Sequence, residues 1–440
     1  MTERGRSEPR RSPGDGARTG APSRRGLLLG AGGAAGAVAG GLSGLAHPLA
    51  AAAAATPAAA APGGRPAALA DSPYRDQVTS FVTSRRSSFL LDGRPWRFGG
   101  TNCYYLHQKS HYMVDSVLND ARAMGLQVVR AWAFADGTER TERALQPEPY
   151  VYDEEAFDSL DYAVMKAGQL GIRMVLPVVN NWDDYGGMAQ YVQWFRGVDV
   201  AEAGGASHDL FYTDPEIQAC FQAWVRHLVG RTNRYTGVRY VDDPAVMTWE
   251  VANEPRCRSD QSGRTLRTFV DRTSRLIARL APRQMVAVGD EGFLGETGSA
   301  DYPYSDYEGA RWAELTNLPF ISYGTLHLYP EYWKGDLSTS EQIAWGERYI
   351  RRHIDDRSVR KPVVLEEYGL GGAFEEAAPV WTSAVEDGGE GSQFWILTAR
   401  QDDGTPYPDY DGHRVVYPSP VAELMTAHSA RMRENPQGGR

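Results

Sequence analysis

The chain has 440 residues, of which 42% are hydrophobic and 23% are charged, an ordinary globular composition. Its formal net charge is -10; the first 70 residues hold eight arginines and three acidic residues, so the remainder carries -15. An acidic body of this kind repels phosphate backbones and anionic lipid surfaces, which argues against a nucleic-acid partner and favours a neutral substrate.

The first 71 residues contain no aromatic residue, and their composition is typical of a targeting segment followed by a linker. Paired arginines at Arg24 and Arg25 precede a weakly apolar Gly/Ala-rich stretch, as in a twin-arginine export signal. We expect a signal over 1–50, a disordered Ala/Pro-rich linker over 51–71, a folded domain over 72–430 and a disordered tail over 431–440. The alternative for the N-terminus is a disordered basic tail. Export would make the protein extracellular.

The folded domain alternates short apolar runs with helical stretches, which predicts a single (β/α)8 barrel preceded by a small β-hairpin at 89–96. The hairpin has an Asp-Gly turn and could plug the N-terminal face of the barrel. A doubly wound sheet is the alternative, but no Gly-rich phosphate turn follows an early strand. The predicted strands are 97–102, 127–132, 173–179, 246–251, 284–289, 320–327, 362–367 and 392–397. The predicted helices are 119–124, 156–170, 216–235 and 265–280.

Three cysteines are spread along the domain, at Cys103, Cys220 and Cys257. They form no CxxC motif or Cys/His cluster, which argues against a structural zinc site. One disulfide is possible, and the sequence does not choose its two partners.

Polar and aromatic residues gather where the predicted strands end, which is where barrel active sites lie. In chain order these are Asn102, Tyr104, Arg130, Trp132, Asn180, Asn181, Trp182, Asn253, Glu254, His327, Tyr329, Glu366, Glu367 and Trp395. The set includes carboxylates, an arginine, amides and several indoles, without a nucleophilic Ser or Cys motif or a metal cluster. It is typical of a site that acts on sugars.

Glu254 and Glu367 are the candidate catalytic pair. Cleavage of a glycosidic bond needs one protonated carboxyl group and one ionised carboxylate. They end the fourth and seventh predicted strands, so they should face each other across the barrel mouth. Either glutamate alone would more commonly be a solvated or ion-paired residue.

Several neighbours are expected to support this pair. Arg130 and Tyr329 could stabilise an ionised Glu367, Asn253 could bind a sugar 2-hydroxyl, and His327 could tune the proton state of the acid. Trp395 could form a stacking platform for a sugar ring. Each has a simpler alternative: a structural ion pair for Arg130, a satisfied core histidine for His327 and a core position for Trp395.

The sequence resembles glycoside hydrolase family 5 of clan A, and within it the endo-β-1,4-mannanases. The matching stretches are RFGGTN (97–102), VRAWAF (129–134), NNWDDYGG (180–187) with Gln190 and Tyr191, WEVANEPRC (249–257), VGDEGF (288–293), TLHLYP (325–330) and EEYG (366–369). They span about residues 85–400. Asn-Glu-Pro alone is clan-wide, whereas NNWDDYGG and the extended NEPRC are typical of the mannanases.

The resemblance implies that Glu254 is the acid/base and that Glu367, rather than Glu366, is the nucleophile of a retaining double displacement. The carboxyl separation should then be about 5–5.5 Å. The resemblance also implies substrate-binding roles for Arg130, Asn253, His327, Tyr329 and Trp395, and subsite roles for Trp132, Asn181, Trp182 and Trp333. It implies action inside mannan, galactomannan and glucomannan chains, with no metal or organic cofactor. We expect a monomer without stable membrane association after export.

Three alternatives remain open at this point. An exo-acting β-mannosidase or a cellulase of the same family would keep both glutamates. A loop that blocks one end of the cleft would favour exo action, and segments 197–210 and 301–307 are the candidates for it. From another class, the chain could be a carbohydrate-binding barrel without catalysis.

Overall fold

The computed structural model describes residues 78–139, 141, 143–200 and 203–436. The predicted export signal, the linker and the first residues of the predicted domain lie outside this part of the chain. Eight parallel strands form one sheet in the order β8-β7-β6-β5-β4-β11-β10-β9. Its edges meet where the Ser322 amide donates to the Val286 carbonyl at 2.7 Å and the His327 amide to the Glu291 carbonyl at 3.2 Å. The predicted (β/α)8 barrel is therefore confirmed. Its strands are β4 (Phe98–Asn102), β5 (Val128–Arg130), β6 (Arg173–Pro177), β7 (Val246–Glu250), β8 (Met285–Ala287), β9 (Gly324–Leu328), β10 (Val363–Tyr368) and β11 (Gly391–Phe394).

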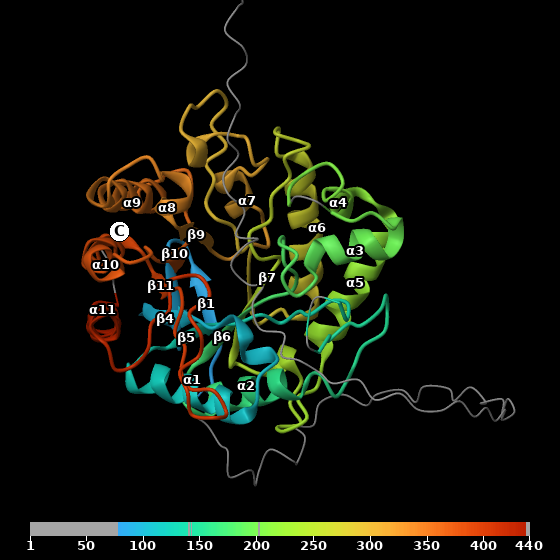
Figure 1. Cartoon of the computed structure of the whole chain (residues 1–440), viewed down its shortest axis with the longest axis horizontal. Helices are drawn as coiled ribbons and strands as arrows, with labels where there is room; N and C mark the ends of the chain where they lie inside the picture. Colours follow the sequence, from blue (N-terminus) through green and yellow to red (C-terminus); the bar gives the residue numbers. More distant parts are fainter. Residues whose placement is uncertain (1–77, 140, 142, 201–202, 437–440) are drawn as a thin grey trace, which may run out of the picture.

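Every residue of these eight strands is buried, because barrel strands are covered by the core on one face and by helices on the other. Figure 1 shows the strands at the centre and the helices around them. The helices are α1 (His111–Ala123), α2 (Asp158–Gln169), α3 (Gly187–Arg196), α4 (Leu210–Thr213), α5 (Pro215–Gly230), α6 (Arg264–Leu280), α7 (Trp312–Thr316), α8 (Pro330–Trp333), α9 (Thr339–Ile354), α10 (Phe374–Gly388) and α11 (Pro420–Glu434). Short 3₁₀ helices lie at Tyr104–His107, Tyr240–Asp242 and Tyr302–Tyr304.

Local sequence sets several helix starts. Asp214 caps α5 by accepting from the amides of Glu216 and Ile217, with Pro215 in the first turn. Ser338 and Glu341 form a reciprocal capping box at the start of α9. Such caps satisfy amides that have no partner within the helix.

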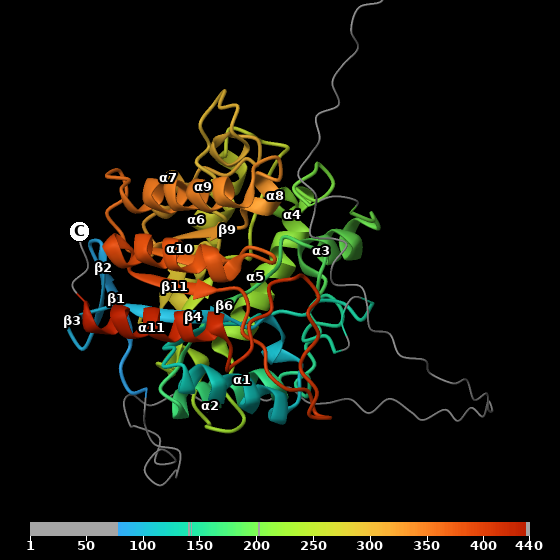
Figure 2. The ribbon, with the colours of Figure 1, turned by 60° about the vertical axis from the view of Figure 1, so that its left-hand side comes forward.

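The predicted N-terminal hairpin is present as part of a three-stranded antiparallel sheet, made of β1 (Val82–Arg85), β2 (Ser88–Leu91) and β3 (Arg94–Trp96). Its buried face packs with residues near the starts of the barrel strands, including Phe98, Val128, Met285 and Val364. Figure 2 shows this sheet at one end of the barrel. The sheet therefore closes the N-terminal face, as expected, and leaves the opposite face for the site.

Several predicted boundaries were wrong, among them the end of α5, which lies at Gly230 rather than at 235. Helix α1 begins at His111 rather than at 119, because Ser110 caps it and Met113, Val114, Val117 and Leu118 already form its buried face. Strand β9 begins at Gly324, four residues after the predicted start at 320. Helix α11 continues to Glu434, beyond the predicted domain end at 430, and the Arg97 guanidinium donates to the Asn435 carbonyl at 3.0 Å. Residues 437–440 lie outside the described part.

Two further observations bear on the expectations from composition. Cys103, Cys220 and Cys257 are all free and buried, so the possible disulfide is not formed. Within the described residues, no helix combines the length and apolarity needed to cross a membrane.

Candidate active site

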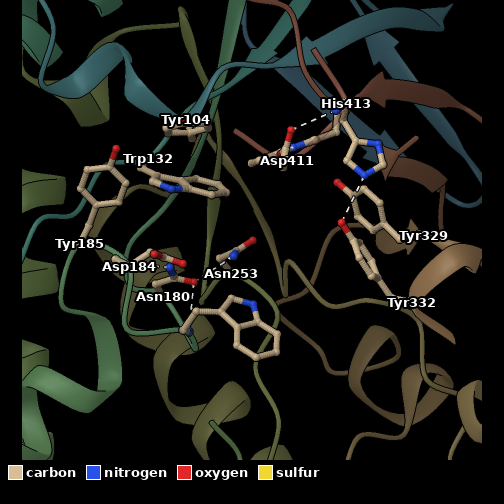
Figure 3. Close-up of a pocket in the computed structure, with 12 residues that line it drawn as sticks. Tyr104, Trp132, Asn180, Asp184, Tyr185, Asn253, Tyr329, Tyr332, Asp411 and His413 are labelled. Atoms are coloured by element: carbon tan, nitrogen blue, oxygen red, sulfur yellow. Dashed lines mark hydrogen bonds between the residues drawn. The ribbon is translucent and has the colours of Figure 1, made fainter. Parts of the chain in front are cut away.

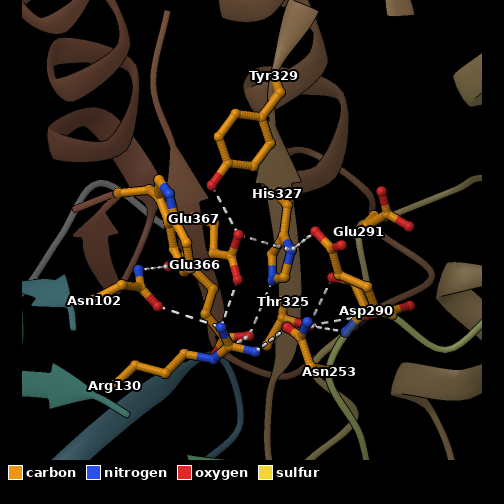
Figure 4. Close-up of polar contacts among 12 residues, drawn as sticks. Asn102, Arg130, Asn253, Asp290, Glu291, Thr325, His327, Tyr329, Glu366 and Glu367 are labelled. Atoms are coloured by element: carbon orange, nitrogen blue, oxygen red, sulfur yellow. Dashed lines mark hydrogen bonds and ion pairs between the residues drawn. The ribbon is translucent and has the colours of Figure 1, made fainter. Parts of the chain in front are cut away.

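Charged side chains from several barrel strands meet at the C-terminal mouth of the barrel (Figure 4). Arg130 ends β5, Glu250 ends β7, His327 is the penultimate residue of β9, and Glu366 and Glu367 lie near the end of β10. The carboxyl ends of barrel strands share one face, so these residues converge. All five are fully buried, which makes their mutual contacts decisive for their charge states.

Glu367 is held by two donors. The Arg130 guanidinium donates through Nη1 to Oε1 at 2.5 Å, and the Tyr329 hydroxyl donates to Oε2 at 2.8 Å. Hydrogen bonds of this kind stabilise negative charge on a carboxylate. The geometry therefore suits an ionised glutamate facing the barrel mouth.

Glu254 lies four residues beyond the end of β7, in a segment that still pairs with its neighbours. The Asn253 amide donates to the Val179 carbonyl at 2.8 Å, and the Glu254 amide to the Gly289 carbonyl at 2.7 Å. Gly289 has a φ of +80°, and a Cβ there would collide with the Ala252 carbonyl oxygen. Glu254 itself has a φ of +51°, a left-handed conformation that is rare outside glycine and is often found at functional sites.

Both oxygens of the Glu254 carboxyl group are engaged. Oε1 lies 2.7 Å from His327 Nδ1, and Oε2 accepts from the Trp182 indole N–H at 2.6 Å. His327 Nδ1 also lies 3.6 Å from Glu367 Oε2, so the imidazole stands between the two glutamates. These two contacts fix the orientation of the Glu254 carboxyl group, as acid/base catalysis requires.

His327 carries positive charge in this setting. Burial alone would lower its pKa, but the nearby carboxylates of Glu367, Glu254 and Glu366 together raise the pKa to about 10. Glu254, His327 and Glu367 are close enough to hold a metal ion by distance alone. A doubly protonated imidazole has no lone pair to offer a cation, so His327 would have to lose a proton before it could bind one.

The two glutamates are close together. One carboxylate oxygen of Glu254 lies within 4.8 Å of one oxygen of Glu367. Retaining glycosidases separate their carboxyl groups by about 5–5.5 Å, whereas inverting enzymes need about 6.5–9.5 Å to admit a water molecule. The observed proximity matches the shorter, retaining spacing.

Arg130 ties several groups of the site together. In addition to Glu367, its guanidinium donates to Glu250 Oε2 at 2.9 Å, to Asn253 Oδ1 at 2.8 Å and to Asn102 Oδ1 at 3.2 Å. Asn253 is fixed further because its Nδ2 donates to Asn180 Oδ1 at 2.9 Å. A planar guanidinium with five donors can orient all of these acceptors at once.

A pocket with aromatic walls opens beside the glutamates (Figure 3). It is lined by Tyr104, Trp132, Asn180, Trp182, Asp184, Tyr185, Asn253, Tyr329, Tyr332, Trp395, Asp411 and His413. Trp395 is held in the wall because Tyr104 stacks on it at 5.7 Å and Asp411 accepts from its indole N–H at 2.6 Å. Flat aromatic faces with polar groups between them suit sugar rings, which present C–H faces and hydroxyl edges.

The structure brings most of the predicted site residues together, but it places two elsewhere. Asn181 is buried away from the pocket, and its Oδ1 accepts from the Arg256 amide at 3.2 Å, so it supports the segment after Glu254. Trp333 packs against Phe293 at 5.7 Å rather than lining the pocket. Its neighbour Tyr332 lines the pocket instead, because successive helical residues point in different directions.

Other lining residues were absent from the predicted binding set. Tyr185 and Asp184 belong to the NNWDDYGG stretch, so the motif carried a signal for them. Asp411 and His413 lie in the long segment after β11, which has no motif and no regular periodicity. Only the tertiary fold reveals them, because this segment reaches Trp395 through a side-chain contact.

The hydrogen bond from Trp182 to Glu254 leads to a first prediction. Trp182→Phe keeps an aromatic plane but removes the N–H donor. On the mannan substrate that the sequence resemblance implies, kcat should therefore fall about tenfold, the value of one hydrogen bond to a charged group, with KM changed less than about threefold. Steady-state kinetics would measure both constants. Trp333→Phe is the matched control and should leave kcat close to that of the wild type. A change in KM alone for Trp182→Phe would mean that the indole only contacts sugar.

Comparison with known proteins agrees with this geometry. Residues 79–380 match the model of the glycoside hydrolase family 5 β-mannosidase-like family. Mannan endo-1,4-β-mannosidase 1 of Solanum lycopersicum is 35% identical over 342 residues, which cover 73% of this chain and 84% of the relative.

Solved structures give the same result. The endo-β-1,4-mannanase of Thermotoga petrophila is 39% identical, with a TM-score of 0.72 over 78% of each chain. The endo-1,4-β-mannanase of Rhizomucor miehei is 33% identical, with a TM-score of 0.71 over 81% of this chain and 100% of the other. The family match covers well over half of the sequence. The chain therefore belongs to the β-mannosidase-like group of glycoside hydrolase family 5.

Proposed function

We propose that this protein is an exported, retaining endo-β-1,4-mannanase that uses Glu367 as nucleophile and Glu254 as acid/base. The observation that carries the proposal is the pair of buried glutamates with oxygens within 4.8 Å, one held by Arg130 and Tyr329 and the other by His327. A non-catalytic binding barrel would not need this costly burial of opposed carboxyl groups.

The reaction follows from these contacts. Glu367 attacks the anomeric carbon while Glu254, bonded to the imidazolium of His327, delivers a proton to the departing glycosidic oxygen. The covalent glycosyl-enzyme is then hydrolysed when Glu254 removes a proton from water. Tyr329 and Arg130 stabilise the charge of Glu367 before the attack and after its release.

We propose mannan as the polymer because the similar proteins described above are named mannan endo-1,4-β-mannosidase and endo-β-1,4-mannanase. We include galactomannan and glucomannan as substrates. The sugar units around the scissile bond would be bound by Arg130, Asn253, His327, Tyr329 and Trp395, together with Trp132 and Trp182 in the pocket wall.

Endo action is favoured by the two loops that could have blocked the cleft. The described residues of 197–210 and 301–307 contribute no side chain to the pocket lining. Both segments pack instead on the chain after Glu254: the Arg258 amide donates to the Gly204 carbonyl at 2.9 Å, and the Arg258 guanidinium lies over the Tyr307 ring at 5.1 Å. We also propose that the protein leaves the cell by the twin-arginine route and acts as a monomer.

The purified protein should be incubated with linear mannan, galactomannan, carboxymethylcellulose and an aryl β-mannoside. Rapid viscosity loss on the mannans, oligomannoside products and initial release of the β-anomer by NMR are the expected results. Mannose as the only product would indicate an exo-mannosidase, and attack on the cellulose derivative alone would indicate a cellulase.

A further inference from the structure

A second pair of carboxyl groups lies beneath the catalytic glutamates and is not used in the mechanism above. Glu250 ends β7, Glu366 lies on β10, and neither side chain is exposed to solvent. Arg130 Nε donates to Glu250 Oε2 at 2.9 Å and lies 3.8 Å from Glu366 Oε2. Glu366 Oε2 is also 3.4 Å from His327 Nε2.

The other oxygen of each group has no donor. Glu250 Oε1 and Glu366 Oε1 are both buried and receive no hydrogen bond from any N–H or hydroxyl group of the described residues. An ionised carboxylate only accepts hydrogen bonds, so two ionised groups would leave these oxygens unsatisfied at considerable cost. Both carboxyl groups approach the same Nε atom of Arg130, at 2.9 and 3.8 Å, and each shifts the pKa of the other through a side-chain hydrogen bond.

We infer that Glu250 and Glu366 share one proton, so that together they hold a single negative charge behind Arg130 and His327. The proton turns one carboxyl group into a donor for the other and satisfies the contact between them. Two buried carboxylates in contact cannot both ionise cheaply, as in other carboxyl pairs that share a proton.

The surrounding charges assign the proton chiefly to Glu250. Burial and the neighbouring Glu366 raise the pKa of Glu250 well above its usual value, although Arg130 opposes this. Burial would also raise the pKa of Glu366, but Arg130, His327 and the hydrogen bond from Glu250 lower it. The pair also interacts electrostatically with the hydroxyl of Tyr323 and, through Glu366, with the carboxyl group of Asp290.

A single charge on the pair balances the site. Arg130 and His327 are two cations, and they face ionised Glu367 and one charge on the Glu250–Glu366 pair. The pair would thus position Arg130 and keep His327 protonated for the proposed reaction. Both glutamates are positioning residues, and their effect on catalysis rests on the proposed function.

Glutamine variants test the shared charge, because glutamine has the shape of glutamate, carries no charge and can donate hydrogen bonds through its NH2 group. Glu250→Gln leaves the charge on Glu366, and Glu366→Gln leaves it on Glu250. Each single variant should therefore retain kcat within about tenfold of the wild type, with Glu250→Gln the milder. The double variant has no charge left, and kcat should fall by roughly tenfold or more beyond the product of the two single effects.

A matched control combines Glu250→Gln with Glu386→Gln, since Glu386 on α10 has its own partners, His428 and Arg431. These two changes should combine as the product of their effects. If the Glu250/Glu366 double variant also gave a simple product, the shared charge would be disproved.

A readout without substrate separates this inference from the proposed function. The infrared spectrum of the wild type minus that of Glu250→Gln should show a positive protonated-carboxyl band, because the other protonated carboxyl groups cancel in the subtraction. Absence of this band would overturn the shared proton, even if the double variant failed to fold. Failure of the wild type to cleave mannan would contradict the proposed function while leaving this spectroscopic result valid.

Discussion

Replacement of Glu367 by alanine should lower kcat on mannan by at least about a thousandfold, while leaving the barrel folded. The variant loses the atom that would bond to the anomeric carbon. It also removes the carboxylate that accepts from Arg130 Nη1 and from the Tyr329 hydroxyl. Product formation on linear mannan measures the loss, and circular dichroism checks the fold.

The sequence neighbour of Glu367 supplies the control. Glu366→Gln alters a carboxyl group on the same strand that lies 3.8 Å from Arg130, but it leaves the proposed nucleophile intact. It should retain kcat within about tenfold of the wild type, because Glu250 can take up the charge. If Glu366→Gln were inactive and Glu367→Ala active, the assignment of the nucleophile would be wrong by one residue.

The barrel and its glutamates could be predicted because their signals are local. Most barrel strands contain a short apolar run, and Glu254 and Glu367 lie after or near the end of two of them within distinctive motifs. Position at a strand end was enough to bring Arg130, His327 and Tyr329 to the same face. Strands that are buried on both faces of a sheet have nearly continuous apolar sequences, and such runs can be recognised in the sequence.

Other parts of the site depend on contacts between distant segments. Asp411 holds the indole of Trp395, but its own segment after β11 has no periodic pattern. Trp333 was predicted to contact substrate because it is a tryptophan near a strand end, yet Tyr332 has the orientation that reaches the pocket. The direction of one side chain in a short helix depends on packing that the sequence does not express.

The contact between Glu250 and Glu366 illustrates the same limit more sharply. Both residues were visible in the motifs WEVANEPRC and EEYG, but 116 positions separate them along the chain. Only the closed barrel brings Glu250 of β7 and Glu366 of β10 to the same Nε atom of Arg130. Their charge state is therefore a property of the fold rather than of either motif.

Replacement of Glu254 by alanine should affect substrates according to their leaving groups. On mannan, whose sugar leaving group needs a proton, kcat should fall by about 10²–10⁴-fold. An aryl β-mannoside with an acidic phenol needs little protonation, so its first step should remain fast and the glycosyl-enzyme should accumulate. A burst of phenol release in stopped-flow measurements would report this, and the alkaline limb of the pH profile for kcat/KM should disappear.

Azide distinguishes the two roles stereochemically, because a small anion can enter the space left by either carboxylate. In Glu254→Ala, azide should attack the covalent intermediate formed by Glu367 and give the β-mannosyl azide, with net retention. In Glu367→Ala, azide should displace the phenol directly from the opposite face and give the α-mannosyl azide. NMR of the two products measures the anomers. A retaining site with this geometry requires opposite anomers from the two variants. If the two anomers were found in the reverse variants, the roles of the two glutamates would have to be exchanged.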